Sequence, residues 1–324
     1  MDLTVLIATY NRAAILGEAI EGVLAQRLAP GVCCELVVVD NNSHDDTKAV
    51  VEHYIRTSAV PVSYLFEGRQ GKSHALNAGL KRAEGDVIAF TDDDVLVSPE
   101  WAATALRVMD RSGADGAGGR ILPKWVTPPP AWLANSARLR SYLALVEGVT
   151  PQVLSYPLSG PGCIWGANMV FRRSVFDEVG EFDVELGPCG GLPVNSEDLD
   201  LVERALRRGF KIVYDPELVV YHRVGAERMR KMYFRRWAFT AGLARTMRAL
   251  PPRGRHVVLG RPFWLYRRAA RAFSQWCGAA LLRRPHTLDL GVDFFHAAGI
   301  LWWYPEAARR ARRREEPEGD PRAR

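Results

Sequence analysis

The chain has 324 residues, of which 48% are hydrophobic, 10% aromatic and 25% charged. This ordinary globular composition excludes a mainly disordered protein, and the length suffices for one large or two modest domains. The formal net charge of +6 is compatible with phosphate-bearing ligands, an anionic membrane face or nucleic acid, and bulk charge does not choose among these partners.

Cysteine spacing and hydropathy predict a cytoplasmic protein. The five cysteines are Cys33, Cys34, Cys163, Cys189 and Cys277. Their odd number and the lack of a C-x-x-C pair argue against a disulfide framework or a zinc knuckle. No signal peptide is predicted, because residues 3–7 already form an apolar run with no basic segment before it. The most apolar late stretch, residues 290–304, contains Asp293 and His296 and is too short for a bilayer span.

The first hundred residues alternate between strand and helix patterns. Strands are predicted over 3–8, 35–39, 62–66 and 87–90, and helices over 13–26, 45–56, 73–82 and 99–109. This alternation predicts βαβ units, and hence an α/β fold with a Rossmann-like, mostly parallel sheet flanked by helices. Active sites of such sheets lie at the carboxyl ends of the strands, so residues 9–12, 40–42 and 92–94 are expected to be neighbours.

The rhythm changes after Gly119. Three prolines at 128–130 precede a predicted helix over 132–146, which we interpret as an insertion at the edge of the site. Strands over 164–171 and 211–220 flank a helix over 197–208, and the chain from Glu227 is helical, arginine-rich and aromatic. We therefore expect an α/β domain over 1–224, a helical extension over 225–311 and a disordered tail over 312–324.

Three adjacent carboxylates, Asp92, Asp93 and Asp94, end a buried strand. Acids can stabilise a helix N-terminus, but the next helix has its own start in Ser98 and Pro99. Like charges crowded at a strand end are costly unless a cation neutralises them. Oxygen ligands suit Mg²⁺ or Mn²⁺, which bridge to substrate phosphates, so a metal role is favoured.

Asp40 and Asn42 follow the second strand, where a carboxylate could accept a hydrogen bond from a nucleotide base. Ser43 and Asp46 have the S-x-x-D spacing of a helix start, which makes Asp45 and Asp46 structural candidates. Neither Asp40 nor Asn42 belongs to this helix start. The sequence is therefore equally compatible with a role as ligand and with a structural role for these two residues.

Gly71, Lys72 and Ser73 do not form a phosphate loop, because Phe66 stands where that motif needs glycine. Lys72 and His74 could lie beside an anion at a helix N-terminus. An exposed lysine and a packed histidine are an equally good interpretation.

Glu197 and Asp198 open a helix for which Ser196 is a suitable N-cap, so capping alone would explain these acids. The alternative is a carboxylate held there as general base for an incoming hydroxyl. His222 follows a strand and is typical of a core or surface histidine unless a metal site lies nearby.

Together these segments resemble the family 2 glycosyltransferases, inverting enzymes of the GT-A fold, over residues 3–224. The similarity rests on six motifs in the order and spacing of that family, which are residues 8–12 (ATYNR), 38–43 (VVDNNS), 71–79 (GKSHALNAG), 91–94 (TDDD), 166–172 (GANMVFR) and 197–201 (EDLDL).

The resemblance implies a role for each matching residue. The donor would be a nucleotide diphosphate sugar, with UDP expected, bound by Thr9, Tyr10, Arg12, Asp40, Asn42, Lys72, Asp92 and Asp93. Mn²⁺ or Mg²⁺ would be held by Asp92, Asp94 and His222. Asp198 would be the catalytic base, and the acceptor side would comprise Trp165, Gly166, Asn168 and Glu197.

Processive members of this family carry a Q-x-x-R-W motif and membrane helices. Residues 233–237 keep the Arg-Trp pair but have Tyr233 in place of the glutamine. We therefore expect transfer of a single sugar to a hydroxyl of a saccharide, lipid-linked or small-molecule acceptor. A polyprenyl-phosphate sugar transferase and a catalytically silent nucleotide-sugar-binding module are the alternatives.

The helical extension mixes aromatic residues with arginines, in particular over 261–276 and at Trp302, Trp303 and Tyr304. It could pack on the α/β domain as a cap, or lie at the inner face of a membrane with arginines on anionic lipid. Nucleic acid is not an expected partner, because the basic residues belong to no recognised nucleic-acid-binding module.

Overall fold

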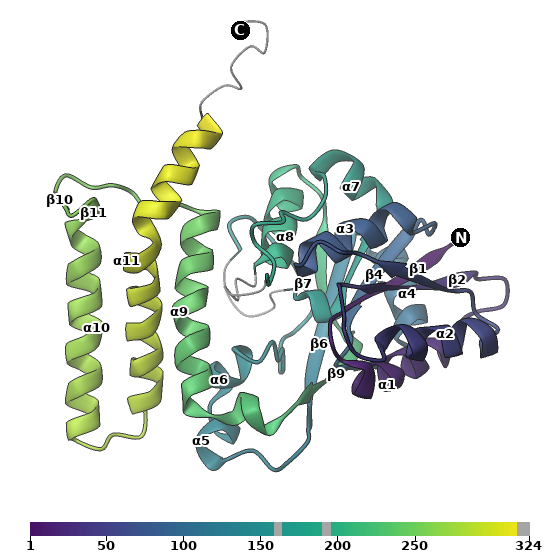
Figure 1. Cartoon of the computed structure of the whole chain (residues 1–324), viewed down its shortest axis with the longest axis horizontal. Coiled ribbons are helices and arrows are strands. Elements are labelled where there is room, and N and C mark those ends of the chain that lie inside the picture. Colours follow the sequence, from purple (N-terminus) through teal and green to yellow (C-terminus); the bar gives the residue numbers. More distant parts are fainter. Residues whose placement is uncertain (159–163, 190–195, 316–324) are drawn as a thin grey trace, which may run out of the picture.

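The computed structural model describes residues 1–158, 164–189 and 196–315. In Figure 1 an α/β domain, which contains the N-terminus, lies beside a layer of three long helices formed by the C-terminal part of the chain.

The N-terminal half consists of the predicted alternation of strands and helices. Its elements are β1 Leu3–Thr9, α1 Ala13–Leu24, β2 Cys34–Asp40, α2 Thr47–Thr57, β3 Val62–Phe66, α3 Lys72–Arg82, β4 Val87–Asp92, β5 Val95–Val97 and α4 Trp101–Ser112. Each predicted strand and helix of this half is confirmed within a few residues. The helix α4 ends at Gly113, whose φ of 57° lies in the left-handed region that glycine adopts without strain.

Two helix starts differ from the sequence-based prediction. The helix α2 begins after Asp46 without a side-chain cap, because the Ser43 hydroxyl instead accepts the N–H of Asn11. Likewise, α4 begins after Glu100 rather than at Pro99. The strand β5 lies between Asp94 and α4, so the three aspartates do not cap that helix.

The second half of the domain departs more from prediction. Its elements are β6 Gly116–Trp125, α5 Ala131–Ala134, α6 Ala137–Ser141, β7 Gln152–Val153, η1 Gly166–Asn168, β8 Met169–Arg172, α7 Arg173–Val179, α8 Glu197–Arg207 and β9 Ile212–Val224. The single helix predicted over 132–146 is wrong. Ser136 caps α6 by accepting the N–H of Leu139 and so separates two short helices, and Val146 pairs with Ile121 as an isolated β-bridge. The strand predicted from 164 begins only at Met169, after the 3₁₀ turn η1.

The nine strands form one mixed sheet in the order β3-β2-β1-β4-β8-β6-β9-β5, with β7 paired to β9. The strands β1 to β4, β6 and β9 share one direction, which confirms the mostly parallel sheet. Alternating residues of β1 point to opposite faces. Leu3, Val5 and Ile7 pack with α1, α2 and α4, whereas Leu6 packs with α3, α7 and α8.

The predicted helical extension is present. It comprises η2 Ala226–Met229, α9 Lys231–Arg248, the short hairpin β10 Val257–Val258 and β11 Arg261–Pro262, α10 Phe263–Leu281 and α11 Thr287–Glu315. Figure 1 shows α9 next to the α/β domain, α11 beside α9, and α10 outermost. The helix α11 includes residues 312–315 of the predicted disordered tail, and residues 316–324 lie outside the described residues.

Within the described residues, no helix combines the length and apolar character needed to cross a membrane. Cys33, Cys34, Cys189 and Cys277 are free thiols, and Cys163 lies outside the described residues.

Candidate active site

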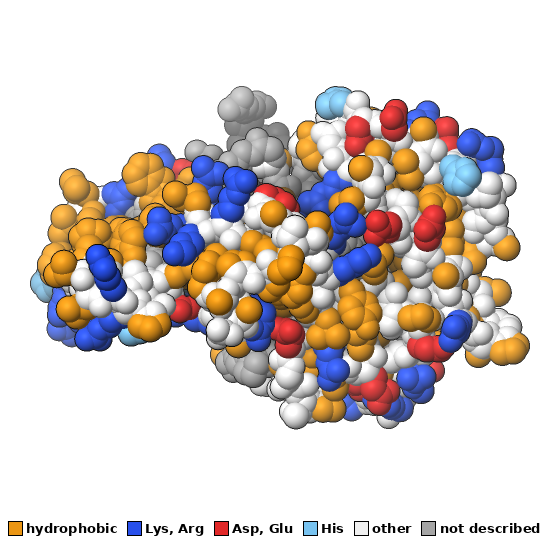
Figure 2. All heavy atoms as spheres, turned by 90° about the horizontal axis from the view of Figure 1, so that it is seen from below, with side chains coloured by type: hydrophobic (Ala, Val, Ile, Leu, Met, Phe, Trp, Pro, Cys, Tyr) orange, Lys and Arg blue, Asp and Glu red, His pale blue; other side chains and the backbone are white. Residues whose placement is uncertain are grey.

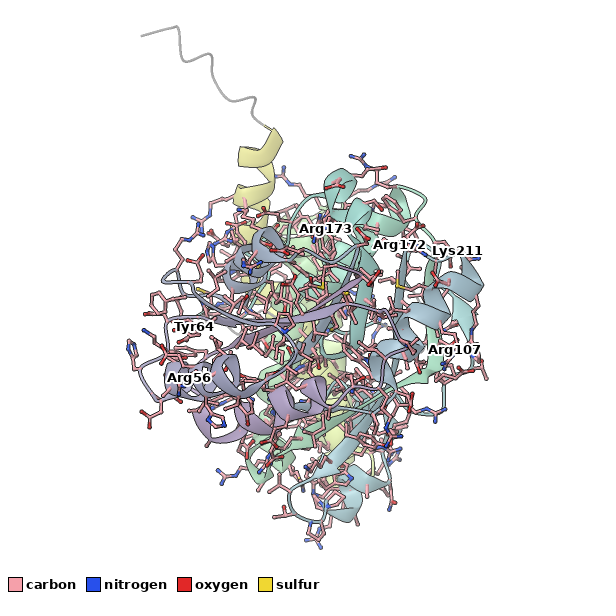
Figure 3. The ribbon with its side chains drawn as sticks, turned by 90° about the vertical axis from the view of Figure 1, so that its right-hand side faces the viewer. Arg56, Tyr64, Arg107, Arg172, Arg173 and Lys211 are labelled. Carbon is pink, nitrogen blue, oxygen red and sulfur yellow. The ribbon has the colours of Figure 1, made fainter. Side chains whose placement is uncertain are left out.

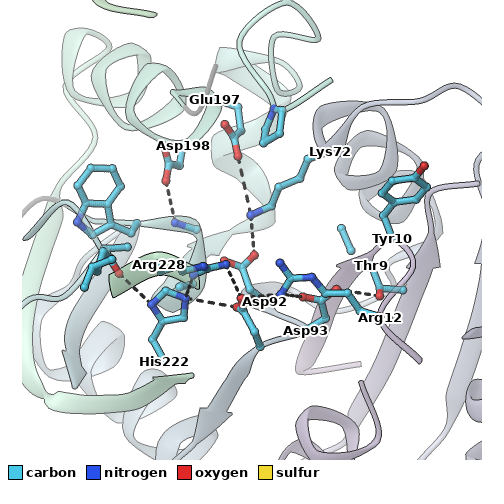
Figure 4. A pocket seen from close by; sticks show the side chains of 18 of the residues that line it. Thr9, Tyr10, Arg12, Lys72, Asp92, Asp93, Glu197, Asp198, His222 and Arg228 are labelled. Atoms are coloured by element: carbon cyan, nitrogen blue, oxygen red, sulfur yellow. Dashed lines mark hydrogen bonds and ion pairs between the residues drawn. The ribbon is translucent and has the colours of Figure 1, made fainter. Parts of the chain in front are cut away.

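A cleft with a volume of about 430 Å³ lies at the carboxyl ends of β1 and β4. Residues around α6 and on α9 also line the cleft. The start of α8, with Glu197 and Asp198, lies across the cleft from the acidic turn (Figure 4). The predicted site residues that line this cleft are Thr9, Tyr10, Arg12, Lys72, Asp92, Asp93, Asp94, Trp165, Gly166, Glu197, Asp198 and His222. The register of β1 with β4 explains part of this arrangement, because Ala8 lies directly opposite Asp92.

The first two aspartates of the acidic turn are neutralised by groups from other elements. Asp92 ends β4 and accepts a hydrogen bond from the Lys72 ammonium at 2.5 Å. Asp93 accepts the Thr9 hydroxyl at 2.8 Å and lies 3.3 Å from the Arg12 guanidinium. Burial nevertheless raises the pKa of Asp93 to about 7, against the opposing charge of Arg12.

Asp94 is surrounded by two guanidinium groups and an imidazole. One of its oxygens lies 2.7 Å from Arg12 and 2.8 Å from Arg228, and the other lies 3.5 Å from Nε2 of His222. Burial by itself would raise the pKa of Asp94, but its contact with His222 and the charges of Arg228 and Arg12 outweigh burial and hold that pKa well below its usual range. Asp94 is therefore an anion in the folded protein.

His222 is oriented by its other ring nitrogen, Nδ1, which lies 2.9 Å from the carbonyl of Leu143. The other ring nitrogen, Nε2, lies 2.6 Å from the Arg228 guanidinium and 3.5 Å from an oxygen of Asp94. His222 and Asp94 thus present one nitrogen and one carboxylate to the same space. Among the described residues, however, no three His, Cys, Asp or Glu side chains come together as a metal-holding cluster.

The predicted metal set of Asp92, Asp94 and His222 is therefore brought together only in part. Asp94 and His222 form a pair, whereas Asp92 is bound to Lys72. The positive charge that the sequence argument requires beside these aspartates comes in part from the protein, because Arg12, Lys72 and Arg228 form ion pairs with them.

Across the cleft, α8 presents two buried carboxyl groups from its first turn. One oxygen of Asp198 accepts the N–H of Gly166 at 2.9 Å, and the other accepts the N–H of Leu199 at 2.7 Å. Burial raises the pKa of Asp198, while these two N–H groups oppose the rise. Burial, with the nearby charge of Asp198, raises the pKa of Glu197 to about 8. Oε2 of Glu197 is buried and has no hydrogen-bond partner among the residues that the structure describes.

Asp40 and Asn42 do not line the cleft. Asp40 is 2% exposed, and its two oxygens accept the N–H of Ser43 and the hydroxyl of Tyr64, each at 2.9 Å. Of the two roles that the sequence left open for Asp40, these two contacts favour the structural one. Asn42 lies beside it in a left-handed turn with a φ of 65°, and the neighbouring Asn41 faces the cleft instead.

Asn168, predicted on the acceptor side, also lies outside the cleft lining. It is fully buried. Its amide donates to the carbonyls of Arg120 and Leu218 and accepts the Trp101 indole N–H at 2.8 Å. Asn168 therefore ties β6 and β9 to α4 beneath the site.

Several cleft residues were not predicted. Arg228 comes from η2, Tyr142 from the end of α6, and Tyr233 and Trp237 from α9. The rings of Tyr142 and Trp237 stack with centroids 4.6 Å apart. Two signals in the sequence pointed here, namely the insertion at the edge of the site and the altered processive motif of residues 233–237.

Comparisons with known proteins agree with this geometry. The family model described as "Glycosyl transferase family 2" matches residues 4–180. A Haloferax volcanii protein named glucosyl-dolichyl phosphate glucuronosyltransferase is 26% identical over 228 residues, which cover 69% of this chain and 70% of the relative. The succinoglycan biosynthesis protein ExoM of Rhizobium meliloti is 25% identical over 240 residues, covering 73% and 71% of the two chains.

Two solved structures have a similar fold. The mannosyltransferase PcManGT of Pyrobaculum calidifontis, solved with GDP-Man and Mn²⁺, has a TM-score of 0.61 at 20% identity and covers 93% of this chain and 87% of its own. Residues 1–349 of Staphylococcus aureus TarS, solved with UDP-GlcNAc, have a TM-score of 0.52 at 18% identity, with 97% and 92% covered. These similarities confirm the GT-A type of fold.

Proposed function

We propose that this chain, which belongs to glycosyl transferase family 2 and is a glycosyltransferase, moves one sugar from a nucleotide diphosphate, with UDP expected, to an acceptor hydroxyl with inversion. The observation that carries the proposal is the cleft itself. It places the buried carboxyl of Asp198 on one side and the acidic turn of residues 92–94, with its cationic partners, on the other. Nucleotide sugars occupy the similar folds of TarS, with UDP-GlcNAc, and PcManGT, with GDP-Man.

The residues present fit a divalent cation at Asp94 and His222. Mg²⁺ and Mn²⁺ sites often use only one or two protein carboxylates, because substrate phosphates and water complete the shell. The oxygen of Asp94 and Nε2 of His222 lie 3.5 Å apart, which suits adjacent ligands of one ion. When bound, such a cation would neutralise the charge that develops on the departing diphosphate. Lys72 and Arg12, on the same side of the cleft, would hold diphosphate oxygens.

In the transfer step, Asp198 would take the proton of the acceptor hydroxyl while the hydroxyl oxygen attacks the anomeric carbon. The bond from that carbon to the diphosphate breaks, and the nucleotide diphosphate leaves with the electron pair. The N–H groups of Gly166 and Leu199 fix the carboxylate for this task. Trp165, Glu197 and the Tyr142–Trp237 stack would border the acceptor.

A polyprenyl-phosphate acceptor is the second candidate, and the Haloferax relative, named for a glucosyl-dolichyl phosphate, favours it. That nucleophile would already be ionised, so Asp198 would matter less. A lipid-linked acceptor of either kind would also require peripheral contact with a membrane. A silent binding module is disfavoured, because Asp92, Asp94 and Asp198 all line the cleft.

Calorimetric titration with UDP tests the donor site. We expect binding only in the presence of Mn²⁺ or Mg²⁺, and a loss of at least about tenfold in Asp94→Ala because a hard-cation ligand is gone. Asp110→Ala, at a carboxylate whose side chain is 77% exposed on α4, is the matched control. Metal-independent binding that Asp94→Ala leaves intact would contradict the metal-dependent assignment.

Asp198→Asn tests the base. We expect it to keep UDP binding and to lose transfer by about a hundredfold or more, since it cannot accept a proton. Full activity of this variant would remove Asp198 as base and favour the polyprenyl-phosphate acceptor.

A further inference from the structure

The helical extension carries a long uninterrupted excess of positive charge. Between Arg228 and Leu288 the chain contains 15 Lys and Arg and no Asp or Glu. Since the whole chain has a net charge of only +6, the remainder is net negative. Such a separation of charge creates a strong local field that attracts an anionic partner.

Most of this charge in the outer part of the extension is not neutralised from within the protein. Among the described residues, no carboxylate lies within ion-pair distance of eight of these arginines. They are Arg253, Arg255, Arg261, Arg267, Arg268, Arg271, Arg283 and Arg284. All except Arg261 are exposed. Clustered like charges repel one another, so anions that cover this surface lower its free energy.

An exposed apolar stripe runs beside these charges on α10. It follows the spacing of one helix face and contains the exposed residues Phe263, Ala270, Phe273, Cys277 and Leu281, with the half-buried Tyr266 among them. At the two ends of α10 the stripe continues into Leu259, 80% exposed, at the tip of the β10–β11 hairpin, and Leu282, 62% exposed. Leu281 is itself 84% exposed. Arg267, Arg268 and Arg271 occupy the adjacent exposed face of the same helix.

The hairpin also contacts α11, because the Arg261 guanidinium donates to the carbonyl of Leu301. The next residue of α11, Trp302, is 67% exposed. Figure 2 shows hydrophobic side chains gathered at the end of the molecule formed by these helices, with Lys and Arg side chains around them.

We infer that the outer face of α10, together with the β10–β11 hairpin, binds the surface of a membrane that contains anionic lipids. An amphipathic helix with aromatic and aliphatic residues on one side and arginines on the other lies in the plane of a lipid interface. Anionic headgroups would neutralise the arginines, and the acyl boundary would take up side chains such as Leu259 and Leu281. Nucleic acid would neutralise the arginines alone and leave the aliphatic side chains in water.

Membrane binding at this face would bring the cleft close to lipid-linked molecules. The helix α9 lines the cleft with Tyr233 and Trp237 and packs against α11, which in turn packs against α10. The inference itself does not rest on the proposed transfer, because vesicle binding is measured without donor or acceptor.

Co-sedimentation of the full chain with vesicles tests the inference. We expect partitioning onto vesicles of phosphatidylcholine with about one-third phosphatidylglycerol, weak partitioning onto pure phosphatidylcholine, and release at high salt. The variant R267Q/R268Q/R271Q should partition about a hundredfold more weakly, since each basic residue near an anionic surface contributes about a factor of five. The variant L259S/F263S/L281S should also bind more weakly while keeping its charge.

A matched control removes the same charge from the opposite side of the molecule. Arg56, Arg107 and Lys211 lie on the side that faces away from α10 (Figure 3), and R56Q/R107Q/K211Q should bind vesicles like the unmodified chain. Unchanged UDP binding and circular dichroism in all variants would show that they are folded. Equal loss in the control variant, no preference for anionic vesicles, or a dimer or RNA complex through α10 without vesicle binding would each overturn the inference.

Discussion

At the scale of single residues, the cleft separates carboxyl groups that keep their charge from those that tend to lose it. Asp94 contacts two guanidinium groups, and its pKa lies well below the usual range. Glu197 is as buried but, in the part of the chain that the structure describes, its one ion-pair partner is Lys72 at 3.9 Å, and its pKa is raised to about 8. Environment thus assigns different protonation states to two acids of one site.

The raised pKa of Glu197 predicts a pH-dependent stability. Its ordinary pKa is 4.5 and its folded value is about 8, so the folded state binds this proton more tightly than the unfolded state. The group therefore lowers the free energy of unfolding as pH rises from about 4.5 to about 8, by up to about 1.4 kcal/mol per pH unit. Chemical denaturation at pH 5 and at pH 8 measures this effect. In Glu197→Gln, the part of the decrease in free energy of unfolding that Glu197 causes between these pH values should be absent. Glu178→Gln, at an exposed position of α7, should follow the unmodified chain, and identical pH profiles for Glu197→Gln would contradict the assignment.

Arg228 is bound to the two side chains that would ligate a cation, because it contacts both Nε2 of His222 and an oxygen of Asp94. Arg228→Ala should therefore tighten Mn²⁺ binding to the donor-free protein, on the order of tenfold, because a positive charge leaves the site. The same change should weaken UDP binding about tenfold, because Arg228 lines the same cleft and its positive charge would attract the diphosphate. Electron paramagnetic resonance of free Mn²⁺ and calorimetry measure the two effects. Arg228→Lys, which keeps the charge, should fall between, and unchanged Mn²⁺ affinity in Arg228→Ala would show that Arg228 does not compete.

At the scale of elements, the layer of long helices depends on close backbone approach. The helices α9 and α11 meet at Gly242 and Gly299. A Cβ atom on Gly242 would lie 2.2 Å from the carbonyl oxygen of His296, and one on Gly299 would lie 2.0 Å from that of Phe239. The absent side chains let these helices pack with their backbones nearly touching.

Gly299→Ala should therefore lower the free energy of unfolding by about 1–3 kcal/mol, the usual cost of an overpacked contact. Gly278→Ala on α10 is the matched control, because its Cβ would meet nothing within 4 Å. There, alanine should raise the free energy of unfolding by about 0.5–1 kcal/mol, as in any exposed helix interior. Urea unfolding measures both, and effects of the same sign would argue against close α9–α11 packing.

At the scale of the whole molecule, contacts cross the boundary predicted at residue 224. The ring of Phe234, fully buried, meets Trp132 edge-on with centroids 5.6 Å apart. Arg248 forms an ion pair with Glu203 at 2.6 Å, with both side chains less than one-fifth exposed. The α/β domain and α9 therefore share a core and one wall of the cleft.

A chain ending at Val224 should consequently fail to fold cooperatively. Removing buried aromatic residues such as Phe234 costs about 3–5 kcal/mol each, which is comparable to the total stability of a domain. Calorimetry should show one transition for the full chain and none, or a strongly lowered one, for residues 1–224. A fragment with the melting temperature of the full chain would establish residue 224 as a true domain boundary.

The local pattern of this sequence was sufficient to predict most of the fold. Apolar runs with β-branched residues are buried on both faces of a parallel sheet whatever surrounds them, and the chain direction in βαβ units brings Thr9 and Asp92 to one edge. Short-range patterns therefore predicted β1 to β4, their helices and the acidic turn. The prediction of a single helix over 132–146 was wrong. Its helical composition is overridden by the helix cap at Ser136 and by the β-bridge of Val146.

The sequence by itself determined the fold class, the family and the acidic edge of the sheet, since these depend on periodicity and on residues close together in the chain. Only the tertiary structure decided that Asp40 and Asn168 lie outside the cleft lining, that Arg228 and Trp237 reach the cleft, and that Asp94 pairs with His222. These outcomes depend on contacts between residues up to 134 positions apart. Distances of that kind are set by how helices and loops pack on the sheet, and no local pattern encodes them.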